Sequence, residues 1–399
     1  MKEVVIVDYA RSAFGKRGGA LKGFYGSTLG GLVLKRLVEK SKIMEKGKLD
    51  SVFGGSSEID AEAYTTPRYM AQVAGLPFDI PGTTVEMACG TAITAINHAA
   101  WKIMAGAADV IIAGGVESHS TWPARFDMTV EPYKGIKPHA IPERLSPYDE
   151  ENTSQVENAD RIAAAWGLTR EECDLFAYNS QQRLARAYES GLIGPEIVPV
   201  TIPGNKKTPA YDFVKDEHPR PDITLEALGK LKPVFEGGMT TAGNASGLND
   251  GAAFVLMMSR EKAEEYGYTP LARWVWGNDT GANPSRLDLC AGRAMVKVAK
   301  EAGIKFADLD VIECNEAFAA QNLGAMREIE RLTGEKIDME KWNPNGGAIA
   351  IGHPNAASGA RIAMFAMRQL AATGGKYGMI ASCCGGGQGT ATILENLVF

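Results

Sequence analysis

The sequence predicts an α/β protein made of two similar halves, and three observations lead to this prediction. Segments with strand character alternate with amphipathic helical segments along most of the 399 residues. The same order of elements occurs twice, first from residue 4 and again from residue 271. The residues between the copies, from about 120 to 245, are rich in proline at their start and follow neither copy. Alternating strands and helices place helices on the faces of a sheet.

The first copy is predicted to contain a strand, a helix, two strands, a helix and a strand. Their expected positions are Val4–Val7, Leu29–Lys40, Leu49–Gly54, a strand through Val85, a helix with Ile93, Ile96, Ala100 and Ile103 on one face, and Asp109–Ala113. The helical assignment follows from apolar residues at intervals of three and four.

The second copy repeats this order. The expected elements are a strand at Leu271–Trp276, a helix at Ala291–Ala302, a strand at Leu309–Glu313, a glycine-rich strand at Asn345–Ile351, a helix from about Ala356, and a strand at Met379–Ser382. We therefore expect three parts: residues 1–119 together with 246–269 form the first half, 120–245 an inserted loop domain, and 270–399 the second half.

The inserted region contains one strong helix signal at Arg170–Ser190. Thr169 is a good N-terminal cap, and Glu172 three residues later completes a capping box. Insertions on a symmetric scaffold commonly carry substrate recognition.

Composition and charge narrow the possible functions. The net charge of −6 gives no basic surface for nucleic acid. The six cysteines show neither a Cys-x-x-Cys pair nor zinc-finger spacing, so no metal site is expected. We find no signal peptide, no apolar run of roughly 18 residues and no C-terminal targeting tripeptide, so we expect no membrane contact and a cytoplasmic location.

Three residues are candidates for covalent chemistry. Cys89 lies where a strand ends and a helix begins, and a thiol facing a helix N-terminus is expected to have a lowered pKa. His353, just before a helix, is a candidate activating base, and Cys383 ends the last strand before a glycine run. Each residue also has a purely structural interpretation, since free cysteines are usually small core residues.

Two polar segments are further candidates. Asn315 and Glu316 follow a strand of the second half, where Asn315 can hold a water or a substrate oxygen and Glu316 can orient the histidine. The alternative is an ordinary helix N-terminus with an acidic residue. Residues 243–251 form a turn-rich segment that can place Ser246 on a ligand, or can be a simple loop.

Together these segments resemble the motifs of the thiolase family in order and spacing. The resemblance covers almost the whole chain, from Arg11–Lys16 to the final glycine run. The segments that carry it most strongly are 216–220, 231–233 and on to Gly251, 315–319 and 352–354. It implies a layered αβαβα fold with two similar mixed-sheet halves.

The implied activity is the reversible Claisen condensation of acyl-CoA and the thiolytic cleavage of 3-oxoacyl-CoA. By resemblance, Cys89 is the acylated cysteine, His353 activates it, and Cys383 moves a proton to or from the α-carbon. Coenzyme A is then substrate or product, no metal or redox cofactor is needed, and a homodimer or homotetramer is expected.

The resemblance also implies binding roles. Asn315 holds a water in one oxyanion hole, and the backbone N–H groups of Cys89 and Gly385 form the other. Ser246 and Arg220 match positions that contact coenzyme A. Glu316, Phe318 and Gln155 complete the candidate substrate-binding residues.

Several positions depart from the family pattern. Cys89 is followed by Thr91-Ala92, His353-Pro354 by Asn355-Ala356, and Cys383 by Cys384. Ser154-Gln155-Val156 stands where a His-Met-Gly segment usually lines the acyl pocket, and the loop Thr121–Asp149 is unlike the family. A polar pocket floor favours a short or polar acyl group.

Two other functions remain open at the level of sequence. One is a fatty-acid or polyketide condensing enzyme on the same fold, although the segment Asn315–Phe318 together with Cys383 argues against it. The other is a thiolase-like subunit that binds acyl-CoA without catalysis.

Overall fold

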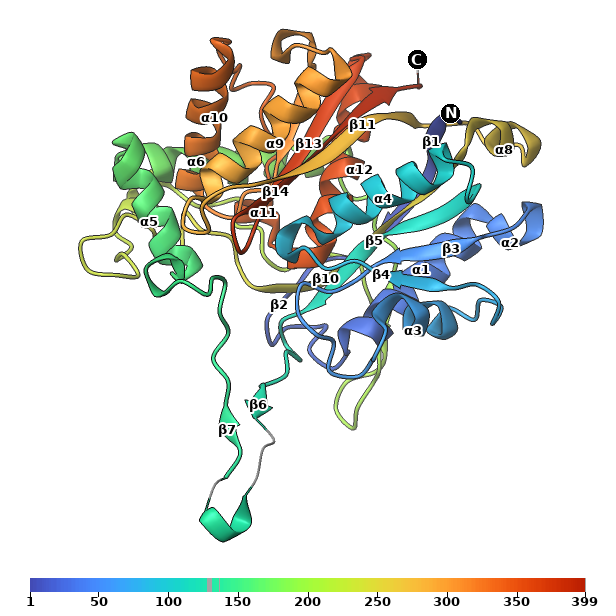
Figure 1. Cartoon of the computed structure of the whole chain (residues 1–399), viewed down its shortest axis with the longest axis horizontal. Coiled ribbons are helices and arrows are strands. Elements are labelled where there is room, and N and C mark those ends of the chain that lie inside the picture. The colour runs from blue at the N-terminus through green and yellow to red at the C-terminus, as the bar shows by residue number, and fades with distance from the viewer. Residues whose placement is uncertain (128–130, 136, 399) are drawn as a thin grey trace.

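The computed structural model describes residues 1–127, 131–135 and 137–398. Its main feature is one ten-stranded mixed sheet (Figure 1). The first half supplies β1 (Val4–Arg11), β2 (Gly15–Lys16), β3 (Ser51–Gly54), β4 (Gly82–Thr84), β5 (Val110–Ser118) and β10 (Asn249–Ser259). The second half supplies β11 (Ala272–Gly281), β12 (Val311–Cys314), β13 (Tyr377–Cys384) and β14 (Gln388–Asn396).

The strand pairings of the two halves are the same. In the first half the order is β1-β10-β5-β3-β4, with two antiparallel contacts followed by two parallel ones. In the second half the order is β11-β14-β13-β12, and a parallel bridge from Ile312 to Trp342 takes the place of β4. The predicted internal repeat is therefore present in the fold.

The halves join where β1 pairs antiparallel with β11 over Val4–Ile6. Helices α4 (Thr91–Met104) and α12 (Ser358–Thr373) contact each other and share one core cluster with strands of both halves. Outside the sheet, α1 (Gly26–Ser41) and α3 (Thr66–Val73) cover the first half, whereas α9 (Leu287–Ala302) and α10 (Ala319–Thr333) cover the second. The result is the αβαβα layering that the family resemblance implied.

Alternation along the strands explains these layers. In β1, Val4 and Ile6 face the central helices while Val5 and Val7 face α1. Because successive side chains point to opposite sides of a sheet, a strand buried on both faces is apolar throughout.

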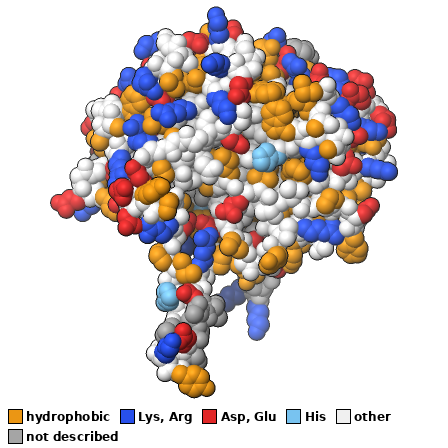
Figure 2. Space-filling model, viewed as in Figure 1, with side chains coloured by type: hydrophobic (Ala, Val, Ile, Leu, Met, Phe, Trp, Pro, Cys, Tyr) orange, Lys and Arg blue, Asp and Glu red, His pale blue; other side chains and the backbone are white. Residues whose placement is uncertain are grey.

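The inserted region adds the remaining elements. They are the hairpins β6–β7 (Phe126–Asp127, His139–Ala140) and β8–β9 (Val200–Ile202, Tyr211–Phe213), and helices α5 (Gln155–Trp166), α6 (Arg170–Glu189) and α7 (Leu225–Gly229). The strands β6 and β7 form an arm that projects from the body (Figure 1). Figure 2 shows hydrophobic side chains on this arm. The exposed hydrophobic residues of this part of the sequence include Phe126, Tyr133 and Ile141.

Shorter elements complete the chain. They are α2 (Ile43–Lys46), α8 (Arg260–Glu265), α11 (Ala348–Ile351), and single 3-10 turns at Ala88–Gly90, Pro132–Lys134, Asp149–Glu151, Phe306–Asp308 and Asn355–Ala357. No helix in the described part of the chain combines the length and apolar character needed to cross a membrane.

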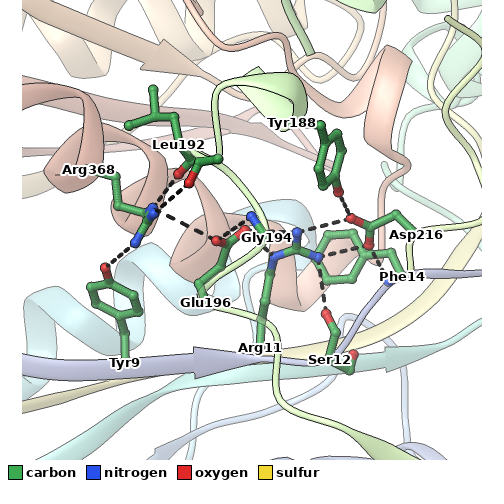
Figure 3. A network of polar contacts seen from close by, with 11 residues as sticks. Tyr9, Arg11, Ser12, Phe14, Tyr188, Leu192, Gly194, Glu196, Asp216 and Arg368 are labelled. Carbon is green, nitrogen blue, oxygen red and sulfur yellow. Dashed lines mark hydrogen bonds and ion pairs between the residues drawn. The ribbon is translucent and has the colours of Figure 1, made fainter. Parts of the chain in front are cut away.

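A buried ion network fastens the inserted region to β1 (Figure 3). The guanidinium of Arg11 binds Glu196 at 2.9 Å and Asp216 at 2.8 Å, and all three side chains are fully buried or nearly so. Asp216 also accepts hydrogen bonds from the Phe14 backbone N–H and the Tyr188 hydroxyl. The segment that follows, which carries Arg220, is thereby held against the first half.

Most predicted elements are confirmed, and two local ones are wrong. The α6 capping box of Thr169 and Glu172 is present. The glycine-rich stretch before His353 is not a strand, because Ala348–Ile351 forms the short helix α11. Residues 249–251 are not part of a loop, because Asn249 and Asp250 are buried at the start of β10.

Candidate active site

Cys89 lies in a tight 3-10 turn that leads from β4 into α4. Its predecessor Ala88 has φ +47°, a left-handed conformation that is strained for a residue with a side chain. Cys89 as a whole residue keeps intermediate exposure, whereas the other five cysteines are buried. Its thiol is nevertheless enclosed by protein, which removes solvent from the sulfur.

The electrostatic surroundings of Cys89 differ from the expectation. Burial, followed by the negative charge of Glu117, raises the pKa of the Cys89 thiol to about 12. The predicted lowering of the Cys89 pKa is therefore wrong: loss of solvation and a nearby carboxylate raise it instead. The resting residue is a neutral thiol.

His353 is held at three points. Its backbone N–H donates to the Asn249 side-chain oxygen at 3.0 Å, and its Nδ1 lies 2.6 Å from the hydroxyl of Ser358. Its Nε2 lies 3.3 Å from the amide nitrogen of Asn315. Because the Ser358 hydroxyl has its own acceptor in the Pro354 carbonyl, Nδ1 carries the hydrogen and Nε2 has the free lone pair.

The ring is also kept uncharged. Burial, with the nearby His119 and Arg361, lowers the pKa of His353 to about 3. A neutral imidazole with an unprotonated Nε2 is the form that can accept a proton.

Cys383 ends β13 beside the Cys89 turn. The hydroxyl of Ser382 donates to the Cys89 carbonyl at 3.2 Å, and the charge of a Cys89 thiolate is one cause that raises the pKa of Cys383 well above its ordinary value, after burial. Cys384 packs against the same turn, since a methyl group at Gly90 would lie 2.4 Å from its sulfur.

The loop after His353 reaches the same place from the other half. The Cys89 turn contacts both Asn355–Ala357 and β13. The backbone of β5 also approaches this loop, because a methyl group at Gly115 would lie 2.1 Å from the Ala356 carbonyl oxygen. The structure thus brings the turn of Cys89, the loop of His353 and the end of Cys383's strand together.

Gly385 faces the inserted region. Leu145 and the side-chain amide of Gln155 lie beside it. A methyl group added at Gly385 would be 3.2 Å from the Leu145 side chain and 3.3 Å from the Gln155 amide nitrogen. The Gln155 side-chain oxygen is buried and has no hydrogen-bond partner among the described residues. Gln155 therefore presents a polar atom next to the glycine run.

The turn-rich segment and the Asn315 segment lie side by side. Ser246 donates its backbone N–H to the Ala317 carbonyl at 2.9 Å, and Ala245 forms a bridge with Phe318. His218 packs on Gly247, and the charge of Arg220 helps burial to lower the pKa of His218 to about 4. Ser246 and Phe318 thus lie on neighbouring segments, and the charge of Arg220 acts on His218, which packs on the residue after Ser246.

The carboxylate of Glu316 forms no hydrogen bond with His353. This carboxylate accepts hydrogen bonds from the Ser180 hydroxyl at 2.6 Å, the Asn343 amide at 2.9 Å and the Ile349 N–H at 3.2 Å. The predicted direct orientation of His353 is wrong, and Glu316 instead holds α11, the helix that precedes His353.

Four residues with contacts at the site were missed from the sequence: Glu117, His119, His218 and Ser358. Glu117 lies near the end of β5 and His119 directly follows it, so their position at a strand end was an available signal. His218 lies in the segment 216–220, which the family resemblance indicated, whereas Ser358 gave no signal, because its importance lies in its buried partner His353. Among the described residues, no group of three His, Cys, Asp or Glu side chains is arranged to hold a metal ion.

Two family models match consecutive parts of the chain: the thiolase N-terminal domain over residues 4–261 and the thiolase C-terminal domain over residues 268–396. The chain belongs to the thiolase family. It is an acyltransferase, and the thiolase fold expected from the motifs is confirmed.

Relatives of this thiolase match along its full length. A β-ketoadipyl-CoA thiolase of Acinetobacter baylyi is 39% identical over 100% of both chains. An acetyl-CoA acetyltransferase of Syntrophomonas wolfei is 39% identical over 99% of this chain and 100% of the other. Family membership excludes neither short nor longer acyl substrates.

Solved structures agree with the fold in detail. The acetyl-CoA acetyltransferase structure from Syntrophomonas wolfei has a TM-score of 0.92 at 34% identity, covering 99% of this chain and 100% of the other. The human mitochondrial 3-ketoacyl-CoA thiolase in complex with CoA has a TM-score of 0.88 at 34% identity, covering 99% and 98%.

Proposed function

We propose that this thiolase condenses acyl-CoA units and cleaves 3-oxoacyl-CoA through an acyl-enzyme on Cys89, with His353 as the base and Cys383 as the group that moves the α-proton. One observation supports this most strongly. The Cys89 turn, the His353 loop and the end of β13 come from different halves of the chain and meet at one place.

Acylation begins from a neutral pair. The Cys89 sulfur attacks the thioester carbonyl while its proton passes to Nε2 of His353. The bond from the acyl carbon to the coenzyme A sulfur then breaks, and the leaving thiolate takes the proton from His353. Because the pKa of Cys89 is raised and that of His353 is lowered, the proton transfer accompanies bond formation and does not precede it.

Carbon–carbon bond formation uses the second thiol. In the condensation direction, Cys383 first passes its proton to His353, and the resulting thiolate removes a proton from the α-carbon of a second acyl-CoA, whose carbanion attacks the acyl carbon on Cys89. The Cys89 sulfur leaves as this bond forms and takes the proton from His353, so that all three groups return to their starting state. In the cleavage direction Cys383 returns the proton, and its raised pKa favours the protonated form that this step requires.

Developing negative charge on oxygen needs hydrogen-bond donors. His353 Nε2, once protonated, and the Asn315 amide lie 3.3 Å apart and face one position from two elements. The backbone N–H groups of Cys89 and Gly385 serve the second position. Fixed donors of this kind stabilise a transition state by about 3–4 kcal/mol each.

Coenzyme A binds beside Ser246, Phe318 and Arg220. Arg220 is exposed and cationic, as a contact to phosphate requires, and Ser246 lies deeper. The CoA complex of the related human thiolase supports the ligand class.

The acyl group is short or polar. The side-chain amide nitrogen of Gln155 lies beside Gly385, and its buried oxygen has no hydrogen-bond partner among the described residues. An aliphatic chain bound here would leave that oxygen unsatisfied, at a cost of about 1–3 kcal/mol. The relative named β-ketoadipyl-CoA thiolase supports a polar acyl group, and the relative named acetyl-CoA acetyltransferase supports a short one.

A panel of 3-oxoacyl-CoA substrates assayed in the cleavage direction tests the proposal. We expect kcat/KM for acetoacetyl-CoA or a 3-oxo-dicarboxylyl-CoA to exceed that for a long-chain 3-oxoacyl-CoA by roughly tenfold or more. Gln155→Met should lower the ratio of kcat/KM for the short or polar substrate to kcat/KM for the long-chain substrate, because an apolar side chain favours the aliphatic chain. Cys89→Ala and Cys383→Ala serve as inactive controls, and a clear preference of the wild type for long chains contradicts the acyl assignment.

A further inference from the structure

Glu117 is a fully buried carboxylate that none of the steps above uses. It lies at the end of β5 and accepts four hydrogen bonds. The donors are the Ser56 hydroxyl at 2.7 Å, the Ser57 backbone N–H at 3.1 Å, the Trp122 indole at 2.9 Å and the Ala356 backbone N–H at 3.1 Å. All four donors are neutral groups, so Glu117 is a buried acid held without an ion pair in the described part of the chain.

The fourth donor links Glu117 to catalysis. Ala356 lies three residues after His353, in the turn Asn355–Ala357 that contacts the Cys89 turn. Gly115, two residues before Glu117, lies against the carbonyl oxygen of the same Ala356. The N–H of Ala356 therefore donates to a side chain of β5, and its carbonyl oxygen packs against the backbone of β5. This strand belongs to the half that carries Cys89.

A second residue of the same strand end acts in parallel. The Nδ1 of His119 lies 2.6 Å from the backbone carbonyl oxygen of Asn249. The side-chain oxygen of the same Asn249 accepts a hydrogen bond from the backbone N–H of His353. The His119 ring packs on Trp122, which also donates to Glu117. The loop of His353 is thus tied to the end of β5 on both sides of the histidine.

We propose that Glu117 is a positioning residue for the thiolase reaction: through Ala356 it fixes the His353 loop against the half of the molecule that carries Cys89. This inference rests on the proposed roles of Cys89 and His353. A base that is displaced by about 1 Å can lose roughly 100-fold in rate, so the contact has catalytic consequences although Glu117 touches no substrate.

The charge of Glu117 gives the proposal a specific signature. Glu117 is the charged group that most raises the pKa of Cys89, after burial, and the thiols of Cys383 and Cys384 are the other titratable groups that interact with Cys89. Removing the charge therefore lowers the pKa of Cys89 and makes it more reactive toward an alkylating reagent. Removing the contact to Ala356 makes turnover slower, so the two effects have opposite signs.

Glu117→Gln tests this directly in the full-length protein. We expect the rate of Cys89 acylation by acetyl-CoA to fall by roughly 10- to 100-fold. We expect iodoacetamide to modify Cys89 faster than in the wild type at each pH between 6 and 9. Peptide mass spectrometry should show the buried Cys173, Cys290 and Cys314 unmodified, which separates a local effect from unfolding.

Two further variants complete the design. Glu117→Asp keeps the charge but shortens the reach to Ala356, so acylation should slow while the pH profile of alkylation stays as in the wild type. If Glu117→Gln does not fold, the acylation rate of Glu117→Asp alone tests the positioning role. Glu328→Gln is the matched control, because Glu328 is a buried carboxylate on α10 that binds Arg293 and Arg331; it should lower stability without changing either rate.

The outcomes separate the two proposals. If wild-type protein forms no acyl adduct on Cys89, the proposed function fails whatever Glu117 does. If the wild type forms the adduct and both Glu117 variants acylate within twofold of it, only the positioning role is overturned.

Discussion

Cys89 and His353, the residues proposed to carry the chemistry, are both uncharged at rest, because the pKa of the thiol is raised and that of the imidazole is lowered. Burial removes solvent from Cys89 and His353, and a carboxylate lies near the thiol instead of a cation. Many reactive cysteines form a thiolate–imidazolium pair, which needs the pKa of the thiol below that of the ring. Here the order is reversed, so the substrate itself has to trigger the proton transfer.

This arrangement predicts the pH dependence of Cys89 alkylation. Only the thiolate reacts, and well below a pKa of about 12 the thiolate fraction rises tenfold for each pH unit. We expect the rate constant with iodoacetamide to rise roughly tenfold per unit from pH 6 to pH 9. A plateau within this range would show a preformed ion pair, and Cys89→Ala provides the background rate.

The identities of the candidate catalytic residues could be proposed from sequence, whereas their electrostatics could not. Cys89 and Cys383 stand at strand ends beside glycines, positions where side chains reach a ligand. The pKa of Cys89 depends on Glu117, 28 positions away and folded against it, and no spacing rule reports such a contact.

At the scale of elements, most of the predicted helices and strands are present, but several elements of the structure were not predicted, among them the helices α3, α5 and α10 and the strands β10 and β14. Helices such as α4 and α6 are long enough for the 3.6-residue repeat to be clear, and α6 has a capping box. The error at Ala348–Ile351 has a physical reason, because four apolar residues fit a short helix as well as a strand. Tertiary contacts decide such cases, here the carboxylate of Glu316 that accepts the Ile349 N–H.

The start of β10 shows the opposite error. Asn249, Asp250 and Gly251 have the composition of a turn, yet they pair with β2 or β5 in the core. Asn249 is buried there because its side chain binds Gly15 and His353. Asn249 thus holds His353 from within a strand. The composition of the segment did not indicate that this polar residue lies in a strand.

At the scale of the whole molecule, the duplication was visible in sequence but the joint between the halves was not. Three residue pairs of β1 and β11 merge the half-sheets into one. The inserted region is fastened by Arg11, Glu196 and Asp216, which lie up to 205 positions apart. Pairings over such distances leave no periodic pattern.

The Arg11 network should dominate the stability of this attachment. Arg11→Met leaves the buried carboxylate of Asp216 without a cation and leaves Glu196 with only the longer 3.9 Å contact to Arg368, and we expect the free energy of unfolding in urea to fall by about 3–5 kcal/mol. Arg36→Met is the control, because its pair with Glu39 is exposed and should change stability by at most about 1 kcal/mol. Similar small losses in both variants would show that the network does not anchor the insertion.

The most direct test of the whole account is the mass of the protein after brief incubation with acetyl-CoA and rapid acid quenching. Peptide mapping should locate one acetyl group on Cys89 in the wild type and in Cys383→Ala, and none in Cys89→Ala. The adduct should form far more slowly in His353→Ala. An acetyl group on another residue, or no adduct on Cys89 in a protein that cleaves acetoacetyl-CoA, would contradict the proposed chemistry.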